Sequence, residues 1–290
     1  MDGSYAQLNP QISVSTGGNR ELEPETSRSI NVSAAYSPAA LQDKDWVANL
    51  DFELAYWNIR LDKAISALDA QLQLDRCVGG EMLLCNGIVR TGQGSISAFN
   101  NELQNLGGIN VRGLDMTITY RAPRRDFGRL RLTSQSSLLL AYEEKVPSAE
   151  GFETVDRTGT IAGTPERAFP KFKSSLALGW MHKQLEVTFT TRYIHSLTEQ
   201  CRDLADFPGT CSDPNPDDDL LSENKLGAMI YNDIQLLWTP QRDLTITAGV
   251  NNMFNRTPPT CYSCSLNGFN GLTYDTPGVF GYLSATYHVQ

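Results

Sequence analysis

The end of the chain alternates between apolar and polar residues over two long stretches, and this period constrains the fold more than any other feature. Every second side chain is apolar in residues 244–250, and the same pattern returns in residues 279–289. Successive side chains of a β-strand point to opposite faces of a sheet, whereas a helix repeats every 3.6 residues. Both stretches are therefore predicted to be β-strands with one apolar face.

Seven earlier segments show the same alternation, which makes nine predicted strands. In one of them the apolar side chains from Trp46 to Tyr56 alternate with Asn49, Asp51 and Glu53. The other six lie at residues 30–36, 114–120, 130–142, 172–180, 185–193 and 228–238. The chain is therefore predicted to be all-β.

The predicted connections alternate between short and long. The short ones cover residues 37–45, 121–127, 182–183 and 239–242, and the long ones cover residues 61–107, 143–167, 197–225 and 255–277. Short turns at one end and long loops at the other are typical of an antiparallel outer-membrane β-barrel, with the turns in the periplasm and the loops outside. A soluble β-sandwich, which is the alternative, mixes loop lengths more freely.

The longest connection is predicted to contain structure of its own. Residues 63–74 are predicted to form a short helix, and residues 88–99 an additional β-excursion outside the nine strands. Counting this excursion as a spanning strand would break the alternation of short and long connections.

Large aromatic residues give an independent indication of a membrane barrel. Six of them lie on the apolar faces, all at the end of the strands that carries the short turns: Tyr36, Trp46, Tyr120, Trp180, Trp238 and Tyr287. Amphipathic rings favour the headgroup level of a bilayer and form girdles around membrane barrels. The competing explanation is that Trp and Tyr are simply common in strands.

Composition excludes several other classes. The sequence has no run of about 18 apolar residues, so no transmembrane helix is predicted, although alternating barrel strands escape such a search. The net charge of −9 disfavours a nucleic-acid-binding protein. The first ten residues lack both the basic start and the apolar core of a signal peptide.

Five motifs near the ends of the predicted strands resemble those of the TonB-dependent outer-membrane receptors. Near the C-terminus they are the run VNNMFN at residues 250–255, the prolines at 258–259, and Tyr274-Asp275 before Gly278. The family usually has an arginine after this glycine and a terminal phenylalanine. This chain has Val279 there and ends in Val289-Gln290, which departs from the family's assembly signal.

The other two matching motifs lie earlier in the chain. The stretch GNRELEPETS is similar to a family stretch that precedes a strand, and a weaker match is GLDMTITY at residues 113–120. The residues that carry the first match are Asn19, Leu22, Pro24, Glu25 and Ser27. Pro24 also holds the preceding residue in an extended conformation, which suits the approach to a strand.

The resemblance implies a fold and a function for the chain. It implies that residues 1–290 are the C-terminal part of a plugged barrel of about 22 strands, with residues 1–27 as an extracellular loop. The plug, the segment that contacts TonB and the signal peptide would precede this fragment. The complete protein would lie in the outer membrane of a Gram-negative bacterium and import a scarce ligand, namely a siderophore, a cobalamin or an oligosaccharide, with energy passed through TonB.

Six cysteines fall in the long connections as three local pairs. The predicted disulfides are Cys77–Cys85, Cys201–Cys211 and Cys261–Cys264, although six cysteines allow fifteen pairings. Disulfide bonds of this kind imply that the chain folds in an oxidising compartment. The rival interpretation is half of a zinc site at the CxxC motif of residues 261–264, but no second CxxC or nearby histidine supports it.

Charged residues in the strands and loops complete the candidate sites. Asp51, Glu53, Lys171, Lys173, Glu186 and Arg192 alternate with apolar residues and are interpreted as a polar lumen lining. Asp213 and Asp217–Asp219 are either a cation site or a solvated loop. No nucleotide-binding, metalloprotease or hydrolase motif occurs, so neither an enzyme nor a cofactor is predicted, and the sequence does not indicate which residues bind the ligand.

Two expectations follow for the chain by itself. Nine strands leave two edges with unpaired backbone groups, which is unfavourable in a bilayer, so the 290-residue chain alone is expected to aggregate or be degraded. The alternative function is a secreted all-β adhesion or carbohydrate-binding module, which would not depend on detergent.

Overall fold

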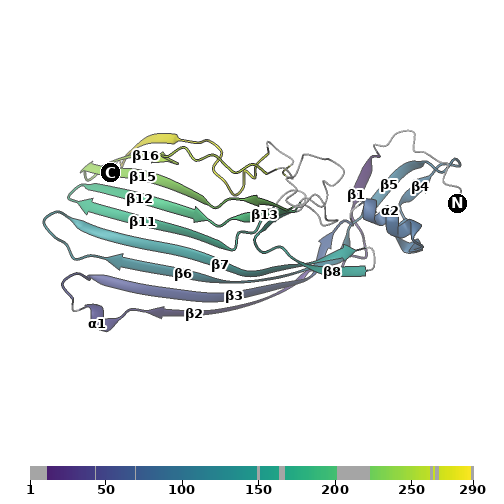
Figure 1. The fold of residues 1–290 in the computed structure, drawn as a ribbon, viewed down its shortest axis with the longest axis horizontal. Helices are drawn as coiled ribbons and strands as arrows, with labels where there is room; N and C mark the ends of the chain where they lie inside the picture. Colours follow the sequence, from purple (N-terminus) through teal and green to yellow (C-terminus); the bar gives the residue numbers. More distant parts are fainter. Residues whose placement is uncertain are drawn as a thin grey trace. The chain divides into compact units, whose positions relative to one another are not determined.

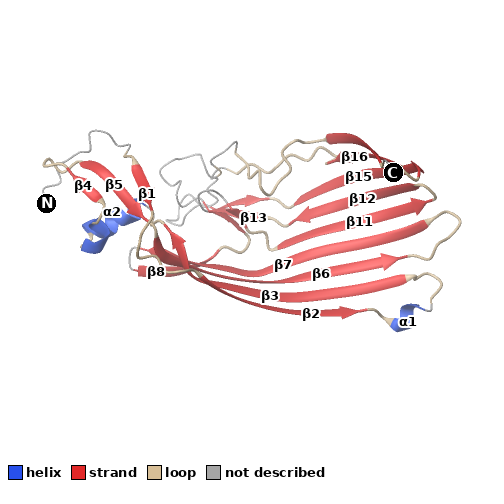
Figure 2. Ribbon diagram, turned by 180° about the vertical axis from the view of Figure 1, so that it is seen from behind, coloured by secondary structure: helices blue, strands red, loops and turns tan. Residues whose placement is uncertain are grey.

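A computed structural model describes residues 12–42, 44–68, 70–148, 151–162, 167–200, 223–261, 264 and 268–288. Strands dominate this part of the chain, and the few helices are short (Figure 1 and Figure 2). The all-β prediction is therefore confirmed. Among the described residues, none of the helices combines the length and apolarity that crossing a bilayer requires.

Nine strands follow one another in chain order across one large sheet (Figure 1). They are β2 (Thr26–Tyr36), β3 (Asn49–Ser66), β6 (Gln104–Arg121), β7 (Arg129–Ser148), β11 (Phe172–His182), β12 (Leu185–Ile194), β15 (Met229–Gln241), β16 (Leu244–Asn251) and β17 (Phe280–Tyr287). Each corresponds to one of the nine predicted strands. A further strand, β8 (Gly151–Asp156), pairs antiparallel with the end of β7. In the described residues β2 and β17 form the two edges of this sheet, which is not closed.

The strand registers bring the apolar residues of neighbouring strands into line. Leu178 of β11 lies opposite Leu132 of β7 and Phe189 of β12, and Phe189 lies opposite Ile234 of β15. These apolar side chains have no second layer over them: Leu178 is 46% exposed and Ile234 is 36% exposed. A contiguous exposed apolar face of this kind is rare in soluble proteins and is what a lipid-facing sheet presents.

The opposite face of the same strands is polar. Thr190 of β12 lies opposite Asp233 of β15, and Thr188 lies opposite Gln235. Gln235 donates a hydrogen bond to the hydroxyl of Tyr282, two strands away on β17, at 2.8 Å. The alternation seen in the sequence therefore separates an apolar face from a polar face.

The large aromatic residues gather where the connections are short. The hydroxyl of Tyr120 donates to the backbone carbonyl of Trp46 at 2.5 Å, and the indole of Trp180 donates to the carbonyl of Phe127 at 2.8 Å. Each hydrogen bond joins a strand to a short connection. Trp238 is 44% exposed, on the apolar face of β15.

The chain divides into two compact units, and the smaller consists of residues 1–30, 58–111 and 142–156. It contains a small sheet in the order β1–β5–β4, with β1 (Val14–Gly17), β4 (Ile88–Arg90) and β5 (Ile96–Glu102). It also contains helix α2 (Ala70–Val78) and the 3₁₀ turn η1 (Met82–Cys85). The hairpin of β4 and β5 lies outside the nine-stranded sheet, as predicted for residues 88–99.

Two local predictions in this unit are wrong. The helix expected at residues 63–74 begins only at Ala70, because β3 continues through Ser66. The extension of β3 is held by contacts from elsewhere in the chain, described below, which a local pattern does not reveal. Residues 1–27 were expected to be loop, yet Val14–Gly17 pairs in parallel with β5 as a strand.

The larger unit consists of residues 31–57, 112–141 and 157–290 and contains the main buried core. A four-stranded sheet lies there in the order β10–β9–β13–β14, formed by β10 (Arg167–Ala168), β9 (Thr160–Ala162), β13 (Leu197–Gln200) and β14 (Glu223–Leu226). Ile161, Leu197 and Leu226 of this sheet pack with Tyr231 of β15 in one cluster. Helix α1 (Ala39–Gln42) occupies the short connection between β2 and β3.

Candidate functional site

The motif GNRELEPETS attaches the segment before β2 to its neighbours through hydrogen bonds. Asn19 accepts a hydrogen bond from the amide of Glu21 at 2.8 Å and donates to the carbonyl of Leu103 at 3.1 Å. The carboxylate of Glu25 accepts from the amide of Ile65 at 2.6 Å. The motif residues therefore fix the entry into β2 and stabilise the extension of β3.

Asn105 at the start of β6 joins the same two segments. Its carboxamide donates to the carbonyls of Glu23 and Lys63 at 2.8 and 2.9 Å, and accepts from the amide of Glu23 at 2.8 Å. Lys63 also forms an ion pair with the carboxylate of Glu23. The hydrogen bond and the charge of Lys63 hold the pKa of Glu23 below its usual value, so this pair is present at neutral pH.

On the polar face of the large sheet, Arg192 of β12 binds two carboxylates. Its Nε lies 2.8 Å from Asp233 on β15, and its two Nη atoms lie 3.1 and 2.5 Å from the oxygens of Asp275. The guanidinium carbon lies 5.1 Å from the ring centroid of Tyr231, within the range of a cation–π contact. Asp275 belongs to the long connection between β16 and β17, so Arg192 ties this connection to the strands.

The motif VNNMFN secures the start of the same connection. The amide of Asn252 donates to Asp233 at 2.7 Å, and its side chain bonds both the amide and the carbonyl of Arg256 at 2.8 Å. Asn252 and Asn255 both have positive φ angles, of 50° and 52°, a conformation that asparagine tolerates better than most residues. The motif residues therefore form a tight turn that leaves the strand.

Below this turn, the connection packs its own side chains into the core. Cys261 is fully buried, and its Sγ lies 3.4 Å from a carboxylate oxygen of Glu199, which is also fully buried. Burial raises the pKa of Tyr274 to about 12, with a smaller contribution from Tyr231, so its hydroxyl is neutral at physiological pH. The described part of residues 252–278 thus forms an anchored lobe of the larger unit, not a solvated loop.

A hollow of about 450 Å³ lies along β6, β7, β11 and β12. Its wall includes small hydroxyl side chains, notably Ser137 and Ser175, and three charged groups, Asp115, Lys173 and Arg192. Two of the six residues predicted to line the lumen therefore lie in it. The other four, Asp51, Glu53, Lys171 and Glu186, lie outside this hollow, and Asp51 instead accepts a hydrogen bond from Ser37 at 2.6 Å.

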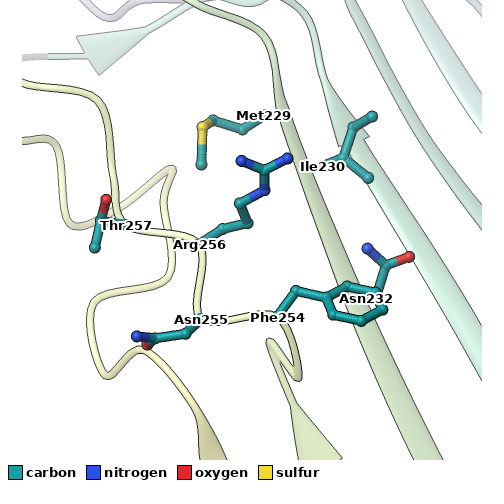
Figure 3. A pocket seen from close by; sticks show the side chains of 7 residues that line it. All are labelled: Met229, Ile230, Asn232, Phe254, Asn255, Arg256 and Thr257. Carbon is teal, nitrogen blue, oxygen red and sulfur yellow. The ribbon is translucent and has the colours of Figure 1, made fainter.

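A second hollow, of about 380 Å³, lies at the beginning of β15 (Figure 3). Ile230, Asn232 and Phe254 combine with the guanidinium of Arg256 to give it both apolar and polar walls. Phe254 is 61% exposed. No partner is found for the Arg256 guanidinium among the described residues.

Two of the three predicted disulfides are present in the structure. Cys77 and Cys85 are joined with an S–S distance of 2.10 Å, and Cys261 and Cys264 with 2.05 Å. The Cys261–Cys264 bond removes the thiolates that the alternative zinc site would require. Cys201, Cys211 and the acidic residues 213 and 217–219 lie outside the described residues, so the third pairing stays a prediction.

Sequence reasoning missed the partners that give these residues their roles. It singled out Arg192, but neither Asp233 nor the use of Asp275 as its counter-ion, and it passed over Asn105. Nothing in local spacing connects residues that are 83 positions apart. In the described part of the chain, no three His, Cys, Asp or Glu side chains gather in a way that would hold a metal ion.

The sequence matches the model of the family described as TonB dependent receptor-like, beta-barrel, over residues 1–253. This match covers most of the chain, and the fold agrees with it: an antiparallel meander with an apolar outer face and long loops at one end. The chain belongs to the TonB-dependent receptor β-barrel family. Proteins of this family lie in the outer membrane of Gram-negative bacteria, which is where this chain is placed.

Solved structures with a similar fold are receptors and transporters. The FrpB iron transporter from Neisseria meningitidis aligns with a TM-score of 0.54 at 14% identity, over 95% of this chain and 33% of that one. The ferric enterobactin receptor PfeA from Pseudomonas aeruginosa aligns with 0.55 at 16%, over 94% and 32%. The siderophore receptor PirA from Acinetobacter baumannii aligns with 0.54 at 14%, over 94% and 33%.

These comparisons bear on the fold and on the extent of the chain. At such low identities the alignments establish the shared fold alone. The chain spans about one third of the length of the solved structures that it matches. No match was found among curated protein sequences.

Proposed function

We propose that the chain is the C-terminal part of the barrel wall of a longer outer-membrane receptor that imports a scarce ligand. In this proposal a plug domain and a signal peptide precede it, and the plug region contacts TonB, which supplies the energy. The chain itself contributes the polar lumen wall and the outer loops, and performs no catalysis.

The exposed apolar face carries this proposal. Apolar side chains of β7, β11, β12 and β15 stand in register and uncovered, with a polar face on the other side. A secreted adhesion or sugar-binding module would have to expose this face to water, which disfavours that alternative. Refolding with and without detergent separates the two proposals, because a lipid-facing band makes the chain insoluble without detergent.

The ligand is proposed to be a siderophore, a cobalamin or an oligosaccharide. The similar solved structures are described as an iron transporter, a ferric enterobactin receptor and a siderophore receptor, which supports testing ferric siderophores first. The hollow along β6 to β12 holds both an acidic and two basic side chains, so its charge selects none of the three ligand classes.

The test measures uptake by cells that express the full-length receptor and lack other receptors of this kind. Radioactive iron bound to a panel of siderophores, and labelled cobalamin and maltodextrins, are supplied with TonB intact or deleted. We expect uptake of one ligand that requires both the receptor and TonB. Uptake that persists without TonB, or no receptor-dependent uptake of any ligand class, contradicts the proposal.

A further inference from the structure

We propose that the smaller unit binds a neutral saccharide in a cavity lined by carboxamide and carboxylate side chains. The cavity measures about 460 Å³, and all of its lining residues belong to this unit. The side chains that face a ligand come from four segments: Glu21, Gln73, Asn86, Asn100, Glu102 and Gln104. The proposal does not depend on transport, because it requires neither TonB nor a ligand in the lumen.

The walls of this cavity are held in place before any ligand arrives. β1 pairs in parallel with β5, which places Gly17 opposite Glu102. The amide of Asn100 donates to the carbonyl of Gly87 at 2.9 Å. Gly87 has a φ angle of +82°, and a Cβ there would lie 2.1 Å from the carbonyl oxygen of Asn100, so only glycine permits this close approach.

Gln73 of α2 provides the strongest indication of a ligand. Its side chain is only 4% exposed, and its Nε2 donates to the carbonyl of Leu84 at 3.0 Å. Its Oε1 is buried and has no hydrogen-bond partner among the residues that the structure describes. Buried polar atoms are nearly always satisfied, so an unpaired acceptor in the wall of a polar cavity indicates a donor supplied by a ligand.

The remaining groups define the chemistry of that ligand. The carboxylates of Glu21 and Glu102 accept hydrogen bonds, whereas the carboxamides of Asn86, Asn100 and Gln104 can both donate and accept. The described residues contribute no cationic side chain to the cavity lining, which disfavours phosphate and other anions. Sugar hydroxyls also donate and accept, so a neutral saccharide matches this set of groups.

The absence of aromatic and aliphatic side chains from the described lining also matters. Without a ring to stack on the sugar, affinity must come from hydrogen bonds that compete with water, so binding is expected to be weak and selective for hydroxyl arrangement. The two carboxylates also make a diamine the principal rival ligand, and the experiment includes it.

Binding is measured on the full-length receptor in lauryldimethylamine oxide micelles, because glycoside detergents would themselves compete. The probes are glucose, galactose, mannose, N-acetylglucosamine and maltose, with putrescine and inorganic phosphate for comparison. Ligand-observed saturation-transfer NMR gives the dissociation constants. We expect saturable binding of at least one saccharide and none of phosphate.

Two isosteric variants locate the site. Glu102→Gln and Glu21→Gln keep the size of each side chain but remove a charged acceptor, and each is expected to weaken saccharide binding about tenfold. Glu21 is exposed, so its variant leaves the fold intact. Glu153→Gln, an exposed glutamate of β8 in the same unit, is the matched control and is expected to bind as the parent does.

Three results would overturn the proposal. They are the absence of saturable binding for every saccharide, saturable binding of putrescine or phosphate alone, and equal affinity of all three variants. Ligand uptake is not the readout, so a negative result here leaves the transport proposal untouched, and a failed uptake experiment leaves this one untouched.

Discussion

Among single residues, Arg192 of β12 joins a neighbouring strand and a long connection through ion pairs. It neutralises Asp233 and Asp275 together and lies against the ring of Tyr231. Without it, two carboxylates would face each other, and like charges at close range repel. The guanidinium of Arg192 therefore contributes to the attachment of the lobe of residues 252–278 at Asp275.

Arg192→Gln is predicted to loosen this lobe. Losing charge-assisted hydrogen bonds costs about 1–3 kcal/mol of stability. Because these bonds attach the lobe to the strands, the substitution weakens this attachment. Trypsin cleavage after the exposed Arg256 of the full-length protein in micelles should become faster. Lys173→Gln, which removes a cation from the same face, is the control, and equal cleavage rates in both variants would contradict the role assigned to Arg192.

The ion pair of Glu23 with Lys63 is predicted to make the attachment before β2 sensitive to acid. The pKa of Glu23 is lowered in the folded protein, so the stabilising effect is present at neutral pH and disappears as the pH falls through this lowered pKa. Hydrogen exchange of the Glu23 amide, which Asn105 holds, should accelerate relative to reference peptides below about pH 4.

The variant Glu23→Gln tests whether the carboxylate of Glu23 causes this pH effect. The variant should lack the acid-induced acceleration, whereas Glu21→Gln, which changes a nearby exposed carboxylate, should keep it. A parent protein whose protection is the same at pH 3 and pH 7, about the range in which carboxylates titrate, would refute the prediction.

Among the strands, two close contacts between an aromatic ring and a glycine recur on the polar face. Trp57 of β3 covers Gly113 of β6, and Tyr282 of β17 covers Gly249 of β16. A Cβ on either glycine would lie 2.4 Å from ring atoms. A ring laid across a strand glycine fills the space of the missing side chain and fixes the pairing of the two strands.

Gly249→Ala is therefore predicted to destabilise the pairing of β15, β16 and β17. The new methyl group displaces Tyr282 and breaks its hydrogen bond with Gln235, at a cost of about 1–3 kcal/mol. In gel electrophoresis after heating, the change from the mobility of the compact folded protein to that of the unfolded protein should occur at a lower temperature. Gly281→Ala is the control, because the nearest atom to its new Cβ lies 3.9 Å away; an equal fall in both variants would argue against the contact.

For the whole molecule, we infer the direction of the strands across the membrane from the short connections. Trp46, Trp180 and Trp238 lie near the four short connections, consistent with an interfacial girdle at that end. The short connections are accordingly assigned to the periplasm and the β4–β5 hairpin to the outside, as in other outer-membrane barrels.

Cysteine labelling of intact cells that express the full-length receptor tests this orientation. Val89→Cys, at a side chain that is 54% exposed in β4, should react with a membrane-impermeant maleimide. Gln241→Cys, at the end of β15, should react only after the outer membrane is permeabilised. Labelling of Gln241→Cys in intact cells, with none at Val89→Cys, would reverse the proposed topology.

The sequence by itself determined the nine strands, their faces and the family. A period of two is a local property, because each residue of a strand lies on the same face as the residues two positions before and after it. Leu178 and Ile234 could therefore be assigned to the apolar face without knowing that Phe189 lies between them. The additional hairpin at residues 88–99 was also predictable, because counting it as a spanning strand would break the alternation of short and long connections that a membrane barrel has.

Only the tertiary structure decided where the strands end and which side chains meet. β3 continues to Ser66 because Glu25 and Asn105, from distant parts of the chain, satisfy its backbone groups. Arg192 acquires its role through its contact with Asp275, and residues of four separate segments together line the polar cavity. Such contacts depend on strand register and loop folding, and no local pattern in the sequence specifies them.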